Sequence, residues 1–262
     1  MTRIQQLFEQ RKADKRAALI AYITAGDPSA ARTLDYARAL EKGGVDLVEL
    51  GLPFSDPIAD GPVIQRASER ALKAGMNVER ALTAVHELRK TSQIPLLLFT
   101  YLNPVLRYGL EKLARDAKTA GIDGCLLTDV SVEEAAPYVN AMRAAALDTV
   151  FLAAPTSTGK RLELVAQYSS GFVYLVSRTG VTGERASLSE SLPALIERMR
   201  RASSLPLAAG FGISTRQQAA DVAKVCDGVI VGSAIVRLIE QNGSPESLTQ
   251  FARSLREAMD AR

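Results

Sequence analysis

Histidine, cysteine and long apolar runs are scarce in this sequence, and each shortage excludes a class of protein. The 262 residues include one histidine, His86, and two cysteines, Cys125 and Cys226. One histidine inside a strongly helical segment excludes histidine-rich zinc sites and a serine or cysteine nucleophile that histidine activates. Two cysteines within apolar segments are too few for a disulfide framework, so we expect both to be reduced and buried.

Nothing in the sequence directs the chain to a membrane or out of the cell. No segment approaches the roughly 18 uninterrupted apolar residues of a membrane span. The N-terminal stretch MTRIQQLFEQRKADKRA has no apolar core and no small-residue cleavage site, so no secretory signal is expected. A formal charge of +3 is too weak to indicate a nucleic-acid or anionic-membrane partner. We therefore expect a cytoplasmic protein.

What the sequence does contain is a regular alternation of apolar segments and amphipathic helical stretches. Nearly continuous hydrophobicity is typical of parallel strands that are buried on both faces. Eight such units favour a closed barrel over a doubly wound open sheet, and they predict one α/β domain over residues 1–262, a (β/α)8 TIM barrel. The expected strands are Ala18–Thr24, Val45–Leu52, Ile94–Tyr101, Gly124–Val130, Thr149–Ala154, Phe172–Ser177, Pro206–Gly212 and Gly228–Ala234.

Capping residues mark the beginnings of several helices. Ser29, Ser131 and Ser214 each precede a helical pattern, and Ser131 has a glutamate three residues later, the spacing of a capping box. Two further helices are expected at the chain ends: Thr2–Asp14 across the bottom of the barrel, and Ser247–Met259 outside it.

Polar residues near the carboxyl ends of the strands are the candidates for chemistry, because barrel active sites lie there. Glu49 is the clearest, since it interrupts the apolar strand VDLVELGL. An interior Arg or Lys could pair with it, yet none of the eight strand segments contains either residue. A glutamate in apolar surroundings is a candidate acid or base with a raised pKa. Asp60, in the following loop, is either a helix cap or a second acid that faces Glu49.

Glycine-rich turns after the last two strands predict an anion site. The segments GFGIS and GSA each lead from a strand into a helix, where backbone N–H groups and the helix N-terminus favour a phosphate. The alternative is that these glycines serve only tight turns. The polar stretch SRTGVTGERASLSES, at residues 177–191, is expected to be either a lid that closes over the substrate or an inert surface loop.

The absence of lysine from every strand argues against a Schiff-base aldolase, and the single helical histidine argues against a metal-dependent one. Bond cleavage would then proceed by proton transfer alone, on a substrate that accepts electrons itself. An indole ring protonated at C3 is such an acceptor.

The segments ELGLPFSDPIADGPVIQ, YLVSRTGVTG, GFGIS and GSAIV closely resemble the tryptophan synthase α-subunit family. The likeness extends over essentially the whole chain and includes AYITAGDP and NPV. It implies a lyase that cleaves indole-3-glycerol phosphate to indole and glyceraldehyde 3-phosphate. Glu49 matches the acid/base, and Asp60 matches the carboxylate that binds the indole N–H. The resemblance also implies substrate contacts at Tyr22, Phe99, Leu126, Thr128, Tyr174, Thr182 and Phe211, and phosphate contacts at Gly183, Gly212, Gly232 and Ser233.

The same resemblance implies a partner, the β subunit, in an αββα heterotetramer that passes indole through a tunnel. Pro53, Asp56 and Asn103 match the partner contacts, although Asp56 before a proline is also an ordinary turn residue. No cofactor is expected in this chain, and pyridoxal phosphate is expected only in the β subunit. Two alternatives stay open: another phosphate-binding barrel enzyme, and a catalytically weak barrel that mainly activates the β subunit.

Overall fold

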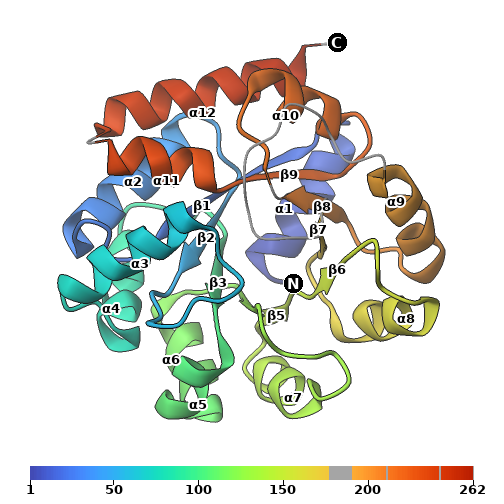
Figure 1. Cartoon of the computed structure of the whole chain (residues 1–262), viewed down its shortest axis with the longest axis horizontal. Helices are drawn as coiled ribbons and strands as arrows, with labels where there is room; N and C mark the ends of the chain where they lie inside the picture. Colours follow the sequence, from blue (N-terminus) through green and yellow to red (C-terminus); the bar gives the residue numbers. More distant parts are fainter. Residues whose placement is uncertain (177–190, 211, 242, 262) are drawn as a thin grey trace.

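The computed structural model describes residues 1–176, 191–210, 212–241 and 243–261. Its strands surround a central axis and its helices form the outer layer (Figure 1). The strands are β1 (Ala18–Thr24), β2 (Leu47–Gly51), β3 (Leu96–Thr100), β4 (Gly124–Leu127), β5 (Asp148–Thr149), β6 (Leu152–Ala153), β7 (Val173–Val176), β8 (Leu207–Gly210) and β9 (Gly228–Val231).

Helices follow almost every strand. They are α1 (Arg3–Ala13), α2 (Ala30–Lys42), α3 (Pro62–Lys73), α4 (Val78–Arg89), α5 (Leu102–Tyr108), α6 (Leu110–Ala120), α7 (Ala136–Ala144), α8 (Gly159–Tyr168), α9 (Ser191–Ala202), α10 (Arg216–Ala223), α11 (Ser233–Glu240) and α12 (Pro245–Asp260).

Among the described residues all strand pairings are parallel, and the strand order is β5-β4-β3-β2-β1-β9-β8-β7-β6. The two ends of this order, β5 and β6, are consecutive in the chain and are separated only by Val150 and Phe151. They are the two halves of the fifth predicted strand, one pairing with β4 and the other with β7. The TIM-barrel prediction is therefore confirmed, and the fifth strand is interrupted where it closes the barrel.

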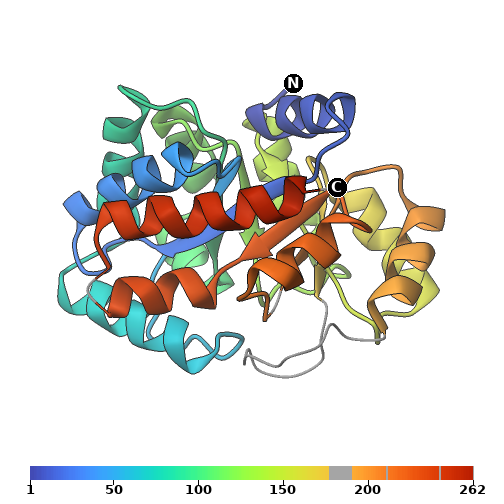
Figure 2. The ribbon, with the colours of Figure 1, turned by 90° about the horizontal axis from the view of Figure 1, so that it is seen from above.

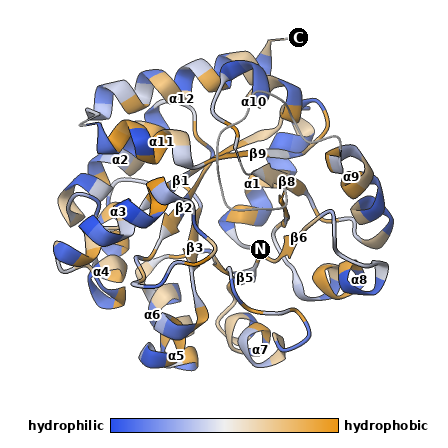
Figure 3. Cartoon of the chain, viewed as in Figure 1, coloured by the Kyte–Doolittle hydropathy of each residue, from blue (hydrophilic) through white to orange (hydrophobic). Residues whose placement is uncertain are grey.

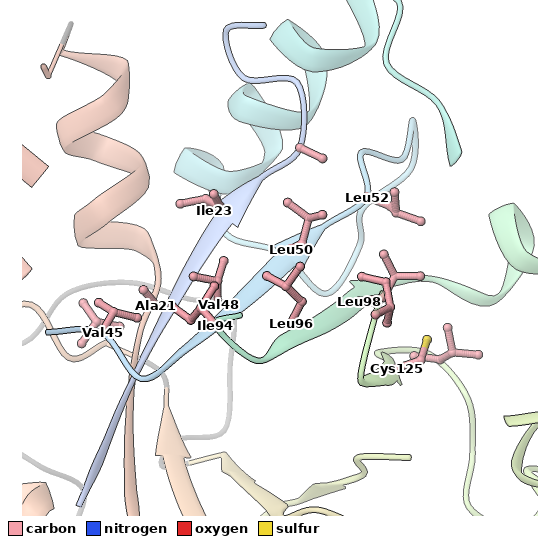
Figure 4. Packing of buried hydrophobic residues seen from close by; sticks show 14 of the residues in the cluster. Ala21, Ile23, Val45, Val48, Leu50, Leu52, Ile94, Leu96, Leu98 and Cys125 are labelled. Carbon is pink, nitrogen blue, oxygen red and sulfur yellow. The ribbon is translucent and has the colours of Figure 1, made fainter. Parts of the chain in front are cut away.

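Side chains alternate between two cores on the two faces of the strands. Those that point inward, such as Ile20, Leu97 and Phe172, form the inner cluster. Those that point outward pack beneath the helices, and Figure 4 shows Ile23, Leu50 and other members from β1, β2 and β3. Figure 3 shows the same division, with apolar colours on the strands and hydrophilic colours on the outer faces of the helices. Burial on both faces explains why the strands read as continuous apolar runs.

Helix α1 closes one end of the barrel, as predicted (Figure 2). It inserts Ile4 and Phe8 into the inner cluster, and the Phe8 ring lies 5.4 Å from the Phe172 ring. Thr2 caps the helix in a capping box with Gln5, and both side chains also donate hydrogen bonds to the buried Asp148 carboxylate. The apolar face and the polar start of α1 thus both fix it to the barrel floor.

One helix start differs from the prediction. The capping box at Ser131 does not form, because α7 begins at Ala136 and the Ser131 hydroxyl donates to Glu133 instead. Pro137 explains the late start, since a proline fits the first turn of a helix but breaks its interior. Small shifts occur elsewhere: Thr215 rather than Ser214 caps α10, and α12 extends from Pro245.

The two cysteines and the single histidine lie where the sequence predicts. Cys125 and Cys226 are buried and unpaired, and His86 is exposed on α4. Among the described residues, no helix is both long and apolar enough to cross a membrane.

Candidate active site

A small cavity opens at the carboxyl ends of the strands and gathers most of the predicted site residues. It encloses about 40 Å³, room for a few water molecules. Eight predicted residues line it, and they come from six parts of the chain that are distant in sequence. The lining residues are Tyr22, Glu49, Asp60, Phe99, Tyr174, Gly212, Gly232 and Ser233, together with Ile64 and Ile230, which the sequence did not suggest.

Glu49 lies in the middle of β2, with Tyr22 of β1 and Leu97 of β3 beside it in register. Its side chain points inward and is 1% exposed. One carboxyl oxygen, Oε1, has no hydrogen-bond partner among the described residues. Burial raises the pKa of Glu49 to about 8, because an ionised carboxylate loses its hydration there. Glu49 is therefore protonated near neutral pH and can both donate and accept a proton.

Asp60 enters the same cavity from the loop between β2 and α3, just before the α3 cap Gly61. The hydroxyl of Tyr101 donates a hydrogen bond of 2.9 Å to its carboxylate. Burial raises the pKa of Asp60 to about 6, and the bond from Tyr101 opposes that rise. At neutral pH the cavity thus holds one protonated and one ionised carboxyl group, the arrangement that divides acid and base roles.

Tyr101 is a site residue that the sequence analysis did not single out. It directly follows β3, its hydroxyl accepts a 3.0 Å hydrogen bond from the Ala59 backbone N–H, and it donates to Asp60. It therefore fixes both the backbone and the carboxylate of the Asp60 loop. Its position at the carboxyl end of a strand was the available signal, because polar residues there line barrel active sites.

Two glycines make room for the tyrosines of the cavity. A Cβ atom on Gly51 would overlap the hydroxyl of Tyr22, and one on Gly210 would overlap the hydroxyl of Tyr174. Burial raises the pKa of both tyrosines well above the usual value, so both stay neutral. The Tyr22 ring also meets the Phe99 ring edge-on at 5.3 Å. The aromatic wall of the cavity thus depends on glycine in the neighbouring strands.

A glycine-rich helix start adjoins the aromatic wall, and a Cβ atom on Gly232 would lie 3.4 Å from the Cβ atom of Tyr22. Gly232 caps α11 and Ser233 is its first residue, and no side chain caps this end of the helix. The partial positive charge at such a helix start favours an anion. Gly212 of the turn after β8 lines the same wall.

Other predicted residues lie elsewhere or are not described. Leu126 is fully buried in the inner cluster, and Thr128 lines a neighbouring cavity of about 280 Å³. Thr182, Gly183, Phe211 and residues 177–190 of the predicted lid lie outside the described residues, whereas Ser191, its last residue, begins α9.

The three predicted partner contacts share one wide cavity. Pro53, Asp56 and Asn103 line about 650 Å³ of space beside α3, α4 and α5. Ile58 and Leu106, in the same two segments of chain, are 79% and 57% exposed. Exposed apolar side chains around a hollow are typical of a protein-binding surface.

The fold and the cavity together define the class of the protein: a (β/α)8-barrel enzyme with two buried carboxyl groups in a cavity at the carboxyl ends of its strands. The family described as "Tryptophan synthase alpha chain" matches residues 8–261. The tryptophan synthase alpha chain of Solibacter usitatus is 60% identical, with both chains covered completely. That of Pelobacter propionicus is 46% identical over 99% of this chain and 98% of its own.

Solved structures agree. A chain in the structure of Mycobacterium tuberculosis tryptophan synthase has a TM-score of 0.93 and 38% identity, over 100% of this chain and 99% of that one. The tryptophan synthase subunit alpha of Legionella pneumophila has a TM-score of 0.89 and 38% identity, with 99% of each chain covered. This chain belongs to the tryptophan synthase alpha chain family.

Proposed function

We propose that this chain cleaves indole-3-glycerol phosphate to indole and glyceraldehyde 3-phosphate, as the α subunit of tryptophan synthase. Family membership supports the reaction. The observation that carries it is the pairing, in one cavity, of the buried Glu49 and Asp60 carboxyl groups with the uncapped start of α11. A phosphorylated substrate with a basic ring carbon needs these three elements.

Protonation of the indole ring is the first step. Glu49, with a pKa of about 8, carries a proton at neutral pH and donates it to C3 of the ring. The ring nitrogen then bears positive charge. The ionised Asp60 carboxylate stabilises this charge by accepting a hydrogen bond from the ring N–H. Tyr101 holds Asp60 in place for this contact.

Carbon–carbon cleavage follows. The Glu49 carboxylate removes the proton from the hydroxyl on the carbon next to the ring. The oxygen lone pair forms the aldehyde carbonyl, the bond to C3 breaks, and its electron pair returns to the ring as neutral indole. Glu49 regains the proton that it lost, so the cycle balances without an external acid, base or oxidant. Gly212, Gly232 and Ser233 would hold the phosphate of the departing aldehyde.

The reaction as written needs no cofactor in this chain, and pyridoxal phosphate would belong to the β subunit. Within the described part of the chain, no group of three His, Cys, Asp or Glu side chains is placed to hold a metal ion. We further infer a cytoplasmic location. We also infer a single domain over residues 1–262, because β5 and β6, at the two ends of the strand order, are consecutive in the chain.

We infer that the surface around Pro53, Asp56 and Asn103 binds the β subunit. The Phe54 ring on this surface lies 5.2 Å from the Tyr101 ring, whose hydroxyl binds Asp60. Tyr101 thus contacts both the ring of Phe54 on the proposed interface and the carboxylate of Asp60 in the cavity. A partner that packs against Phe54 would restrict Tyr101, and with it Asp60.

Indole release from indole-3-glycerol phosphate tests the reaction and the partner together. We expect the purified chain to release indole slowly, and the rate to rise strongly when a β subunit is added. Leu106→Glu, which places a charge on an exposed side chain of α5 that does not line the catalytic cavity, should lose the stimulation and keep the basal rate. Absence of release under both conditions would overturn the proposed reaction and favour a barrel that only activates its partner.

The two raised pKa values predict a bell-shaped pH profile. kcat/KM should rise as Asp60 ionises at about pH 6, because only the carboxylate stabilises the ring cation. It should fall as Glu49 loses its proton at about pH 8, because the ring can no longer be protonated. Asp60→Asn should remove the acidic limb and leave the basic one. A flat profile between pH 5 and 9 would contradict both assignments.

A further inference from the structure

An ion-pair cluster joins the three elements that carry the cavity walls. Asp27, in the turn after β1, is 2% exposed. Arg70 of α3 binds both of its carboxylate oxygens, from Nε at 2.7 Å and from Nη2 at 2.8 Å. The third nitrogen of Arg70, Nη1, donates at 2.8 Å to Glu240, the last residue of α11. The guanidinium fork thus connects β1, α3 and α11 through one side chain.

Each of these elements carries or adjoins a cavity residue. Tyr22 lies near the carboxyl end of β1, the end that Asp27 follows. Asp60 lies two residues before the start of α3 and Ser233 begins α11, so in both helices the cavity lies at the end away from the ion pairs. Figure 1 shows α3 and α11 side by side against β1, and all three elements contact one another. The helices have 12 and 8 residues, so they are rigid rods about 18 Å and 12 Å long. Any tilt between their C-terminal halves is transmitted to their N-termini, where the cavity lies.

The contact with Asp27 is the strongest part of the cluster. It is a bidentate pair to a buried carboxylate, which fixes orientation as well as distance. Removing Arg70 would leave the Asp27 charge buried without a cation. The neighbouring Arg66 also binds Glu240 through two nitrogens, but its side chain is 50% exposed and does not contact Asp27. Arg66 thus shares the contact with Glu240 but has no link to the buried carboxylate after β1. Arg66 is therefore a natural control for Arg70.

We propose that Arg70 is a positioning residue that sets the distance between Asp60, at the indole end of the site, and the anion-binding turn at Ser233. The proposal rests on the proposed function, since it concerns a substrate that spans both ends. A single molecule that binds both ends is sensitive to their separation. Separate fragments, each bound at one end, are not. This difference separates positioning from a merely structural role.

The experiment compares Arg70→Met with Arg66→Met in the full-length chain. Arg70→Met is expected to lower kcat/KM for indole-3-glycerol phosphate by about 10- to 100-fold, because a displacement on the order of 1 Å at a distance from the reacting atoms has an effect of that size. Inorganic phosphate and indole, measured separately as inhibitors, should each bind within about twofold of the wild type. Arg66→Met should match the wild type in all three measurements.

Three results would overturn the proposal: a normal rate in Arg70→Met, equal losses in Arg70→Met and Arg66→Met, or fragment affinities that fall in parallel with kcat/KM. If Arg70→Met does not fold, Arg70→Lys serves instead. It keeps the charge but not the fork, and it should show the same pattern with a smaller loss. Failure of the wild-type chain to release indole would refute the proposed reaction itself. A normal rate in Arg70→Met would refute only the role of Arg70.

Discussion

Glu49→Gln is expected to reduce indole release by a factor of about 1,000 or more, because two proton transfers depend on this one carboxyl group. Glutamine keeps the size of the side chain but neither donates nor accepts the proton that the reaction moves. The start of α11 and the turn at Gly212 are unaffected. Inorganic phosphate should therefore still bind with wild-type affinity, as measured by inhibition of the wild type and by direct titration of the variant.

Asp60→Asn is the matched comparison for this experiment. It removes a charge that stabilises the reaction but not the proton carrier, so a measurable rate should remain. Near-normal turnover in Glu49→Gln would refute the assignment of Glu49 as acid and base. Loss of phosphate binding in the same variant would show that the substitution disturbs the cavity rather than the chemistry.

Glu49→Gln should also make the folded protein more stable, and the gain in the free energy of unfolding should depend on pH. The pKa of Glu49 is about 8 in the folded chain, against 4.5 for an unperturbed glutamate. Between these values the folded protein keeps a proton that the unfolded chain has lost. The wild type therefore loses stability as the pH rises from 4.5 to 8, whereas glutamine does not. Above pH 8 the difference should reach about 3–5 kcal/mol.

Urea unfolding at pH 5 and at pH 8.5 measures this difference. Glu163→Gln, on the exposed face of α8, is the control and should show no comparable change between the two pH values. A gain of equal size at both pH values would mean that glutamine packs better, and that ionisation of Glu49 is not the cause. The expected result means that the protein retains a destabilising group in its core for the sake of its chemistry.

The sequence predicted the barrel well because each strand is buried on both faces and is therefore apolar throughout. It predicted Glu49 for the same reason, since a carboxylate stands out in such a strand. The break between β5 and β6 was not predictable, because Val150 and Phe151 are as apolar as the strands around them and are also buried. The predicted start of α7 is wrong because the capping-box spacing at Ser131 would place Pro137 inside the helix, where a proline is not tolerated.

Contacts between distant residues limited the prediction of the site. Tyr101 reaches Asp60 across 41 positions, and Arg70 reaches Glu240 across 170. Neither pair has a local pattern, so only the folded chain shows them. The aromatic wall of the cavity was unpredictable for the same reason. That position 51 must be glycine is evident only in the folded chain, where the Tyr22 hydroxyl occupies the place of a Cβ atom.

The closure of the barrel floor by α1 has a consequence for the order in which the chain folds. This helix is synthesised before the strands that it contacts, since Thr2 binds Asp148, which lies 146 residues later, and Phe8 packs against Phe172. Until those strands exist, Ile4 and Phe8 have no partners and remain exposed to water. Contacts of such sequence separation form slowly. Helix α1 thus leaves the ribosome well before it can reach its place, and for that interval it is an apolar surface that other molecules can bind.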